Sequence, residues 1–285
     1  MKTIRIATRA SQLALVQARW VGAALQASHP GLEVELVEVT TTGDLDRTSP
    51  VATLTEVGAF VRSVQQAVLD GRADVAVHSC KDMPVHGPDG LRLVFPRREV
   101  PWDVMCGSTV AALPAGARVG TGSPRRSAQL ALLRPDLVID EIRGNVDTRL
   151  AKVESGEYDA IVLAEAGLKR IGRTGAVAER LTVEDMVPAP AQGALAVEVR
   201  TGEPPEAAAL ALDHAATRRA VETERLVLER TGAGCRSALG LFADADGSTI
   251  RVHGFVSDRH GPRSARAEGS DPEEAAASII GRLSL

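Results

Sequence analysis

The stretch VLDGRADVAVHS, residues 68–79, recurs later in the chain as VESGEYDAIVLA, residues 153–164. Each copy combines the end of a helix, a glycine turn and an apolar run with the length of a buried strand. The residues that align are Gly71 with Gly156, Asp74 with Asp159, and Val77 with Val162. This repeat predicts two α/β lobes of similar build.

Two further pairs of segments repeat in the same order along the chain. The pairs are residues 4–8 with 117–121, and residues 36–44 with 138–145. Ser11 and Ser123 follow the first pair as expected helix caps, and Pro124 suits a first helical position. The helix after Ser11 is expected to bury Leu13, Val16, Trp20 and Ala24. Mostly parallel strands joined by helices follow from this order, and we expect a ligand cleft between the lobes, at the strand ends.

The pattern changes after residue 187. The segment TGEPPE at 201–206 is typical of a linker, and a helix-like run follows at 212–230. Strands are expected at 238–243 and 249–256, then a helix that begins at Asp271. We therefore predict three domains: residues 1–95 with 190–208, residues 96–189, and a small α+β domain of residues 209–285.

Composition narrows the class of protein. The 285 residues carry a net charge of −4, with 44% hydrophobic and 25% charged residues, and no apolar run reaches the length of a membrane span. Seven aromatic residues (Phe 4, Trp 2, Tyr 1) and a mildly acidic balance argue against nucleic acid as a partner. The first residues lack the pattern of an export signal, so a cytoplasmic protein without a membrane partner is expected. Three cysteines at wide spacing predict neither a disulfide framework nor a metal site.

Arginine accounts for nearly all of the positive charge. Only four of the 33 basic residues are lysine. Six arginines lie at or after predicted strand ends, near two helix N-termini: Arg9, Arg125, Arg126, Arg143, Arg149 and Arg170. Guanidinium groups there, with the hydroxyls of Ser11, Thr121 and Ser123, would bind a ligand with several carboxylates. The alternative is that the hydroxyls only cap helices and the arginines are only solvated.

Two segments hold candidates for chemistry. In ADVAVHSCKDMP, residues 73–84, a buried strand runs into Lys81 and Asp82, which suits acid/base or cation-stabilising chemistry; a surface ion pair is the alternative. A metal at His78 and Cys80 is not expected, because the spacing is not that of a zinc site. Cys235 follows a glycine-rich turn and could carry a covalent group or be a buried thiol.

Six motifs occur in the order and spacing of the porphobilinogen deaminase family, which the chain resembles over residues 4–256. They are HSCKDMP, GTGSPRR, RGNVDTR, LAEAGLKR, APAQGA and GAGC. The resemblance implies two lobes similar to periplasmic binding proteins plus a small third domain. It also implies a cytoplasmic, monomeric transferase of tetrapyrrole and haem biosynthesis, which joins four porphobilinogen molecules head to tail, releases ammonia and gives hydroxymethylbilane.

The resemblance further implies site residues. A dipyrromethane cofactor would be bound through a thioether to Cys235. Asp82 would stabilise the positive charge on the pyrrole nitrogen as ammonia leaves, and would assist proton transfer when the terminal ring attacks the methylene-pyrrolenine. The implied cofactor-binding residues are Ser11, Lys81, Asp82, Thr121, Ser123, Arg125, Arg126, Arg143 and Gln192. The implied substrate-binding residues are Arg9, Ser11, Phe60, Arg149 and Arg170, of which the three arginines would act with Asp82 in catalysis. No metal is implied.

The chain departs from the family pattern in three places. Thr53 and Val57 stand where many members have lysines, Val100 replaces a usual aspartate, and Ala238 stands where a proline is common. None of these changes removes a chemical group named above. Two other functions fit the lobed architecture: a non-catalytic binding protein for a polycarboxylate, and a phosphate-ester enzyme, although the chain lacks a Walker-type loop.

Overall fold

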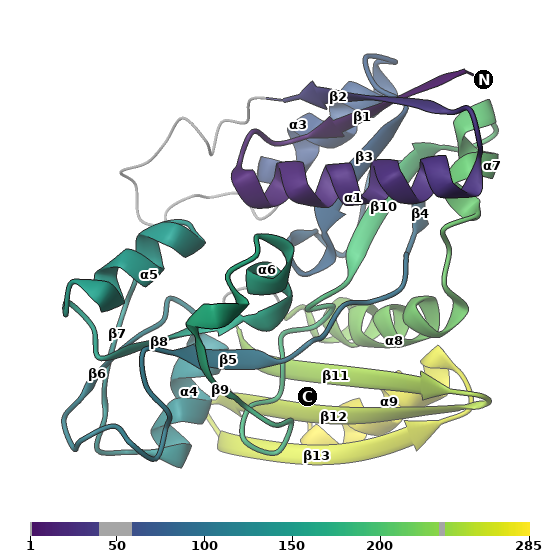
Figure 1. The fold of residues 1–285 in the computed structure, drawn as a ribbon. Helices are drawn as coiled ribbons and strands as arrows, with labels where there is room; N and C mark the ends of the chain where they lie inside the picture. The colour runs from purple at the N-terminus through teal and green to yellow at the C-terminus, as the bar shows by residue number, and fades with distance from the viewer. Residues whose placement is uncertain (1, 40–58, 234–236) are drawn as a thin grey trace. The chain divides into compact units, whose positions relative to one another are not determined.

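The computed structural model describes residues 2–39, 59–233 and 237–285, apart from the side chains of Ala59 and Phe60 (Figure 1). Two compact units can be separated within it. Unit 1 comprises Met1–Arg98 and Ala194–Arg218, and unit 2 comprises Glu99–Gly193 and Arg219–Leu285. None of the helices in the described ranges is long and apolar enough to cross a membrane.

Unit 1 contains a five-stranded mixed sheet in the order β2-β1-β3-β10-β4. The strands are β1 (Thr3–Thr8), β2 (Glu33–Glu38), β3 (Val75–Ser79), β4 (Leu91–Val94) and β10 (Leu195–Arg200). β1 pairs in parallel with β2 and β3, whereas β10 runs antiparallel to both of its neighbours, β3 and β4. One strand of this sheet therefore comes from a part of the chain that lies far beyond the other four.

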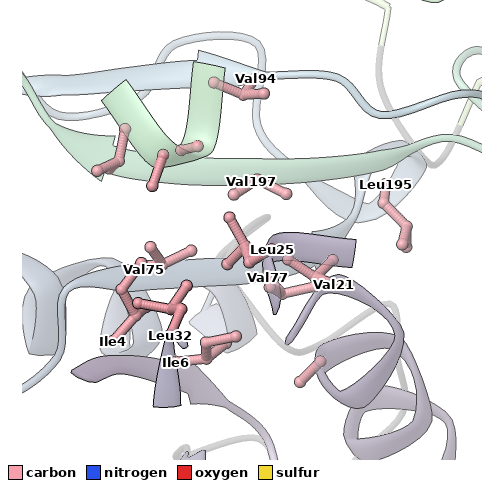
Figure 2. Close-up of a cluster of buried hydrophobic side chains, with 14 residues drawn as sticks. Ile4, Ile6, Val21, Leu25, Leu32, Val75, Val77, Val94, Leu195 and Val197 are labelled. Carbon is pink, nitrogen blue, oxygen red and sulfur yellow. The ribbon is translucent and has the colours of Figure 1, made fainter. Parts of the chain in front are cut away.

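Helices cover both faces of this sheet because buried side chains alternate along its strands. The helices are α1 (Gln12–Ser28), α3 (Ala59–Leu69), α7 (Pro204–Leu210) and the short 3₁₀ helix η1 (Cys80–Asp82). Ile4, Val75 and Val77 pack against α1 in the cluster of Figure 2, whereas Ala7 and Ala76 pack against α3.

The buried face of α1 differs from the predicted one. Ala18, Val21 and Leu25 are buried, but Trp20 is 48% exposed. Gly22 lies on the buried face, where a Cβ would be 2.9 Å from Val34, so the absent side chain lets α1 approach the sheet closely.

Unit 2 contains a second five-stranded sheet, in the order β7-β6-β8-β5-β9. Its strands are β5 (Asp103–Cys106), β6 (Arg118–Gly120), β7 (Val138–Asp140), β8 (Ala160–Ala164) and β9 (Val177–Arg180). Its helices are α4 (Pro124–Leu133), α5 (Val146–Glu154), α6 (Glu165–Arg170) and the 3₁₀ helix η2 (Thr174–Ala176). In both sheets the fourth strand of this order, β10 or β5, runs antiparallel to the other four, which confirms the predicted pair of similar α/β lobes.

The repeat extends to single hydrogen bonds. Asp74 accepts the backbone N–H of Arg5 at 2.8 Å, and Asp159 accepts that of Arg118 at 2.7 Å. The backbone N–H groups of the two aspartates donate in return to the carbonyl oxygens of the same two arginines. Each aspartate thus fixes the start of a parallel strand to the strand beside it.

A smaller α+β part of unit 2 begins where the chain enters that unit for the second time, at Arg219. It contains α8 (Ala215–Thr231, shared with unit 1), an antiparallel sheet of β11 (Ala238–Asp246), β12 (Thr249–Asp258) and β13 (Gly261–Gly269), and α9 (Pro272–Leu283). Asp271 caps α9 as predicted, by accepting the N–H of Glu274. The α+β class of this part is confirmed; its status as a third domain and the cleft between the lobes stay predictions.

Candidate functional site

A pocket in unit 1 brings together three of the predicted site residues. Arg9 and Ser11 reach it from the loop after β1, and Asp82 reaches it from η1, directly after β3. Ser11 also caps α1, since its hydroxyl accepts the N–H of Ala14. Parallel strands end at the same edge of a sheet, so these loops meet there, as the sequence predicts.

The carboxylate of Asp82 is exposed in this pocket. Among the described residues, none forms a hydrogen bond or ion pair with it, so the alternative of a surface ion pair with Lys81 is not supported. Lys81 lies beside it in η1 but does not line the pocket. A carboxylate without a protein partner at the end of a strand can interact with a cationic ligand.

Unit 2 carries the equivalent loop after β6. Ser123 caps α4 by accepting the N–H of Arg126, and Pro124 occupies the first turn, as predicted. The buried Thr121 hydroxyl accepts the N–H of Ser123 at 3.2 Å. Both hydroxyls therefore shape the loop, which leaves the free N–H groups of the helix start near it.

A residue that the sequence analysis did not single out, Asp103, binds three of the predicted cofactor residues. Its fully buried carboxylate accepts hydrogen bonds from Arg125 at 2.7 Å, Arg126 at 2.6 Å and Gln192 at 3.0 Å. Burial opposes the charge, but the two guanidinium groups outweigh it and hold the pKa of Asp103 well below its usual range. One negative charge therefore offsets one of the two positive charges, and a net positive charge remains for a ligand.

Asp103→Asn is expected to lower the free energy of unfolding by about 3 kcal/mol or more, because it leaves buried guanidinium groups without a counter-charge. Chemical denaturation at neutral pH measures this change. The stabilisation is complete above about pH 4, the ordinary pKa of an aspartate, and is lost as the pH falls, so the two proteins should converge in acid. Asp136→Asn is the matched control, since its partner Arg134 forms an exposed pair with it. Equal effects of the two changes would contradict the assigned role of Asp103.

Arg149 and Arg170 differ from this pair because backbone carbonyl oxygens, not carboxylates, accept their hydrogen bonds. Arg149 donates to Gly144 at 2.7 Å, and Arg170 donates to Gly193 at 2.7 Å. Burial lowers the pKa of Arg170 to about 10, and burial together with the charge of Arg126 lowers that of Arg149. A lowered pKa means that the protein leaves the positive charge partly uncompensated, and a bound anion would stabilise it. The two groups therefore fit a ligand with carboxylates.

The other predicted site residues discussed next either lie apart from the groups described above or fall outside the described part of the structure. Arg143 is exposed and pairs with Glu141 at 2.8 Å. Phe60 lies in the first turn of α3, but its side chain falls outside the described part of the structure. Cys235 lies outside the described residues, as do Thr53 and Val57; α8 ends before Cys235 and β11 begins after it.

The fold and these residues define an α/β protein of two similar lobes. Guanidinium groups stand at strand ends, together with the Asp82 carboxylate, which has no partner among the residues that the structure describes. The chain belongs to the porphobilinogen deaminase family. Residues 4–207 match the family model described as "Porphobilinogen deaminase, dipyromethane cofactor binding domain". The porphobilinogen deaminase of Roseiflexus sp. (strain RS-1) is 45% identical over 279 residues, which cover 95% of this chain and 92% of that protein. The porphobilinogen deaminase of Geotalea uraniireducens (strain Rf4) is 43% identical over 278 residues, which cover 96% of this chain and 87% of that protein.

Solved structures of other proteins are more distant. A periplasmic binding protein of Salmonella typhimurium with high arginine specificity aligns with a TM-score of 0.41 at 14% identity, over 74% of this chain and 92% of that one. The second substrate binding domain of Lactococcus lactis GlnP aligns with a TM-score of 0.44 at 12% identity, over 81% and 91%.

Proposed function

We propose that this chain joins four porphobilinogen molecules head to tail, with release of ammonia, to give hydroxymethylbilane. The observation that carries the proposal is the pair of partly buried guanidinium groups, Arg149 and Arg170, whose hydrogen bonds go to carbonyl oxygens and not to carboxylates. Each porphobilinogen carries an acetate and a propionate, so a growing chain of pyrroles presents many carboxylates to such groups. Family membership supports the same activity.

The residues of the two units suit different parts of this reaction. Arg9, Arg149 and Arg170 would bind the carboxylates of the incoming substrate, and the side chain of Phe60 would pack near its ring. The carboxylate of Asp82 would stabilise the positive charge that develops on the pyrrole nitrogen while the bond to the amine breaks. A fixed carboxylate without a protein partner is effective there because it needs no reorganisation during the reaction.

A dipyrromethane cofactor is implied by the matched family domain, and the donor groups of the chain fit its carboxylates. When bound, it supplies the pyrrole carbon to which each new unit is joined. We assign its attachment to Cys235. Its carboxylates would be held by Ser11, Lys81, Thr121, Ser123, Arg125, Arg126, Arg143 and Gln192. The internal counter-ion Asp103 would then orient three of these groups, Arg125, Arg126 and Gln192, before any ligand is bound.

The other parts of the proposal concern partners and location. A monomer in the cytoplasm, with no nucleic acid or membrane partner, remains the expectation from composition and from the family. A non-catalytic polycarboxylate-binding protein is disfavoured because the relatives at 43–46% identity are named as deaminases along most of the chain. A phosphate-ester enzyme is disfavoured on the same ground.

Intact mass spectrometry with Ehrlich's reagent tests the proposal directly. The protein purified from a host that makes porphobilinogen is expected to exceed the mass of the bare polypeptide by one dipyrromethane, and to give the colour of a pyrrole with a free position. The same protein made in a host unable to form porphobilinogen is the control, with the bare mass and no colour. Bare mass and no colour from both hosts would refute the covalent cofactor.

A further inference from the structure

One ionisable side chain that lines the Asp82 pocket has no part in the roles assigned so far. His78, the fourth residue of β3, contributes to the same wall as Arg9, Ser79 and Asp82. It is only 7% exposed. An imidazole buried to this degree needs polar partners from the protein, and their identity determines what the ring can do.

The partner of His78 is a buried carboxylate on the neighbouring strand. His78 Nε2 lies 3.0 Å from Oε2 of Glu198 on β10, and Glu198 is 2% exposed. The other oxygen of Glu198 accepts the amide N–H of Gln65 on α3 at 2.9 Å. Neither His78 Nε2 nor Glu198 Oε2 makes an aligned hydrogen bond within the described residues, so the contact between them is electrostatic. The carboxylate is therefore held from one side by an amide and faces the imidazole on the other.

This arrangement determines which ring nitrogen is left for exchange. An ionised carboxylate attracts a proton on the nitrogen nearest to it, which places a proton on Nε2. The other ring nitrogen, Nδ1, can then gain or lose a proton while the ring keeps its orientation. Among the described residues, Glu198 on β10 contacts the ring, and the charged groups that line the pocket with it are Arg9 after β1 and Asp82 after β3. Helix α1 contributes the uncharged amide of Gln17 to the pocket, and α3 contributes that of Gln65 to Glu198.

We propose that His78, oriented by Glu198, is the proton-transfer residue of the Asp82 pocket. The inference rests on the proposed function of that pocket. In each cycle, the imidazolium gives a proton to the departing amine, and the electron pair of the breaking C–N bond leaves with ammonia. After the new C–C bond has formed, the pyrrole ring carbon at that bond loses its proton to the imidazole. The imidazole thereby regains the proton that it gave to the amine.

The division of tasks follows from the two environments. The resemblance also gives Asp82 a part in proton transfer, but its exposed carboxylate has no partner among the described residues and is available to a developing cation throughout. A group that loses and regains a proton in each cycle should be distinct from the group whose negative charge stabilises the cation. His78 is the titratable group of the pocket that meets this requirement, and Glu198 acts through it as a positioning residue.

His78→Asn tests the proposal, because asparagine retains a polar side chain but cannot exchange a proton near neutral pH. The variant should keep its covalent cofactor and a KM for porphobilinogen within about twofold, while kcat falls by about 100-fold. In a plot of kcat against pH, the change in kcat between about pH 5 and 8 should disappear. His86→Asn, which removes an exposed imidazole of the same segment, should change neither quantity.

Two further measurements keep the proposal falsifiable if His78→Asn fails to fold. Glu198→Gln should lower kcat less than His78→Asn, since it keeps the imidazole but removes the carboxylate that orients it. The unmodified holoenzyme should itself show an ionisation between about pH 5 and 8 in kcat. An unchanged kcat in His78→Asn, or a wild-type profile flat over this range, would overturn the role of His78. Full turnover in Asp82→Asn would instead overturn the proposed function of the pocket.

Discussion

Asp82→Asn is expected to fold normally, to retain its covalent cofactor and to lose at least about 100-fold in turnover. Asparagine has the shape of aspartate but carries no negative charge beside the cation that forms as ammonia leaves. Stability should hardly change, because no described residue forms a hydrogen bond or ion pair with this carboxylate. The rate of ammonia release under saturating porphobilinogen measures the loss.

Asp89→Asn is a matched control for that experiment, since Asp89 is exposed on the same segment of unit 1. It should turn over at the wild-type rate. Near-normal ammonia release from Asp82→Asn would assign the stabilisation of the cation to another group. A loss of both turnover and cofactor would show that Asp82 serves binding more than the chemical step.

Cys235→Ser is expected to carry no covalent cofactor and to fall to background turnover, because a serine hydroxyl does not form the thioether. Intact mass measures the attachment and ammonia release measures the turnover. The other two cysteines are poor substitutes. Cys80 is 2% exposed and Cys106 is 1% exposed, and burial raises the pKa of the Cys106 thiol to about 11, which disfavours its reactive thiolate.

Cys80→Ala and Cys106→Ala are the matched controls, and both should retain the added mass of the cofactor. An adduct that persists in Cys235→Ser would move the attachment to one of these buried thiols. Peptide mapping of the adduct would then identify which of them carries it.

The lobed fold could be predicted from the sequence because its signals are local and occur twice. A glycine turn, a capping serine and an aspartate before a buried strand each act over a few residues. The two copies fold into the same sheet order, down to the aspartates at 74 and 159 that accept the N–H of an arginine in the adjacent strand. Two strand-ending loops with hydroxyls and guanidinium groups were predictable for the same reason.

Features that depend on distant partners escaped the sequence analysis. Asp103 precedes a short apolar run, and nothing nearby in sequence indicates that Arg125, Arg126 and Gln192 converge on it. His78 belonged to the predicted run of ionisable residues at the end of its strand, but its partner was not predicted, because Glu198 becomes its neighbour through the pairing of β10 with β3. A carboxylate within the apolar run ALAVEV, residues 194–199, was the available signal for Glu198.

Surface patterning misled the analysis in two other places. The helical periodicity of α1 placed the large Trp20 in the core, whereas the buried face contains Ala18, Val21 and Leu25 and leaves Trp20 exposed. β13 was not expected, because its alternating arginines and small residues do not resemble a strand with an apolar face; its pairing with β12 defines it. Tertiary packing determined both outcomes.

The position of β10 also has a consequence for the biosynthesis of the chain. β10 lies between β3 and β4, yet its residues leave the ribosome only after all five strands of the second sheet. Until then, β3 and β4 have unpaired backbone groups along the edges that β10 will join. The first lobe therefore cannot complete its sheet while the chain is being synthesised up to residue 194, and a nascent chain of that length is the one most in need of protection from aggregation.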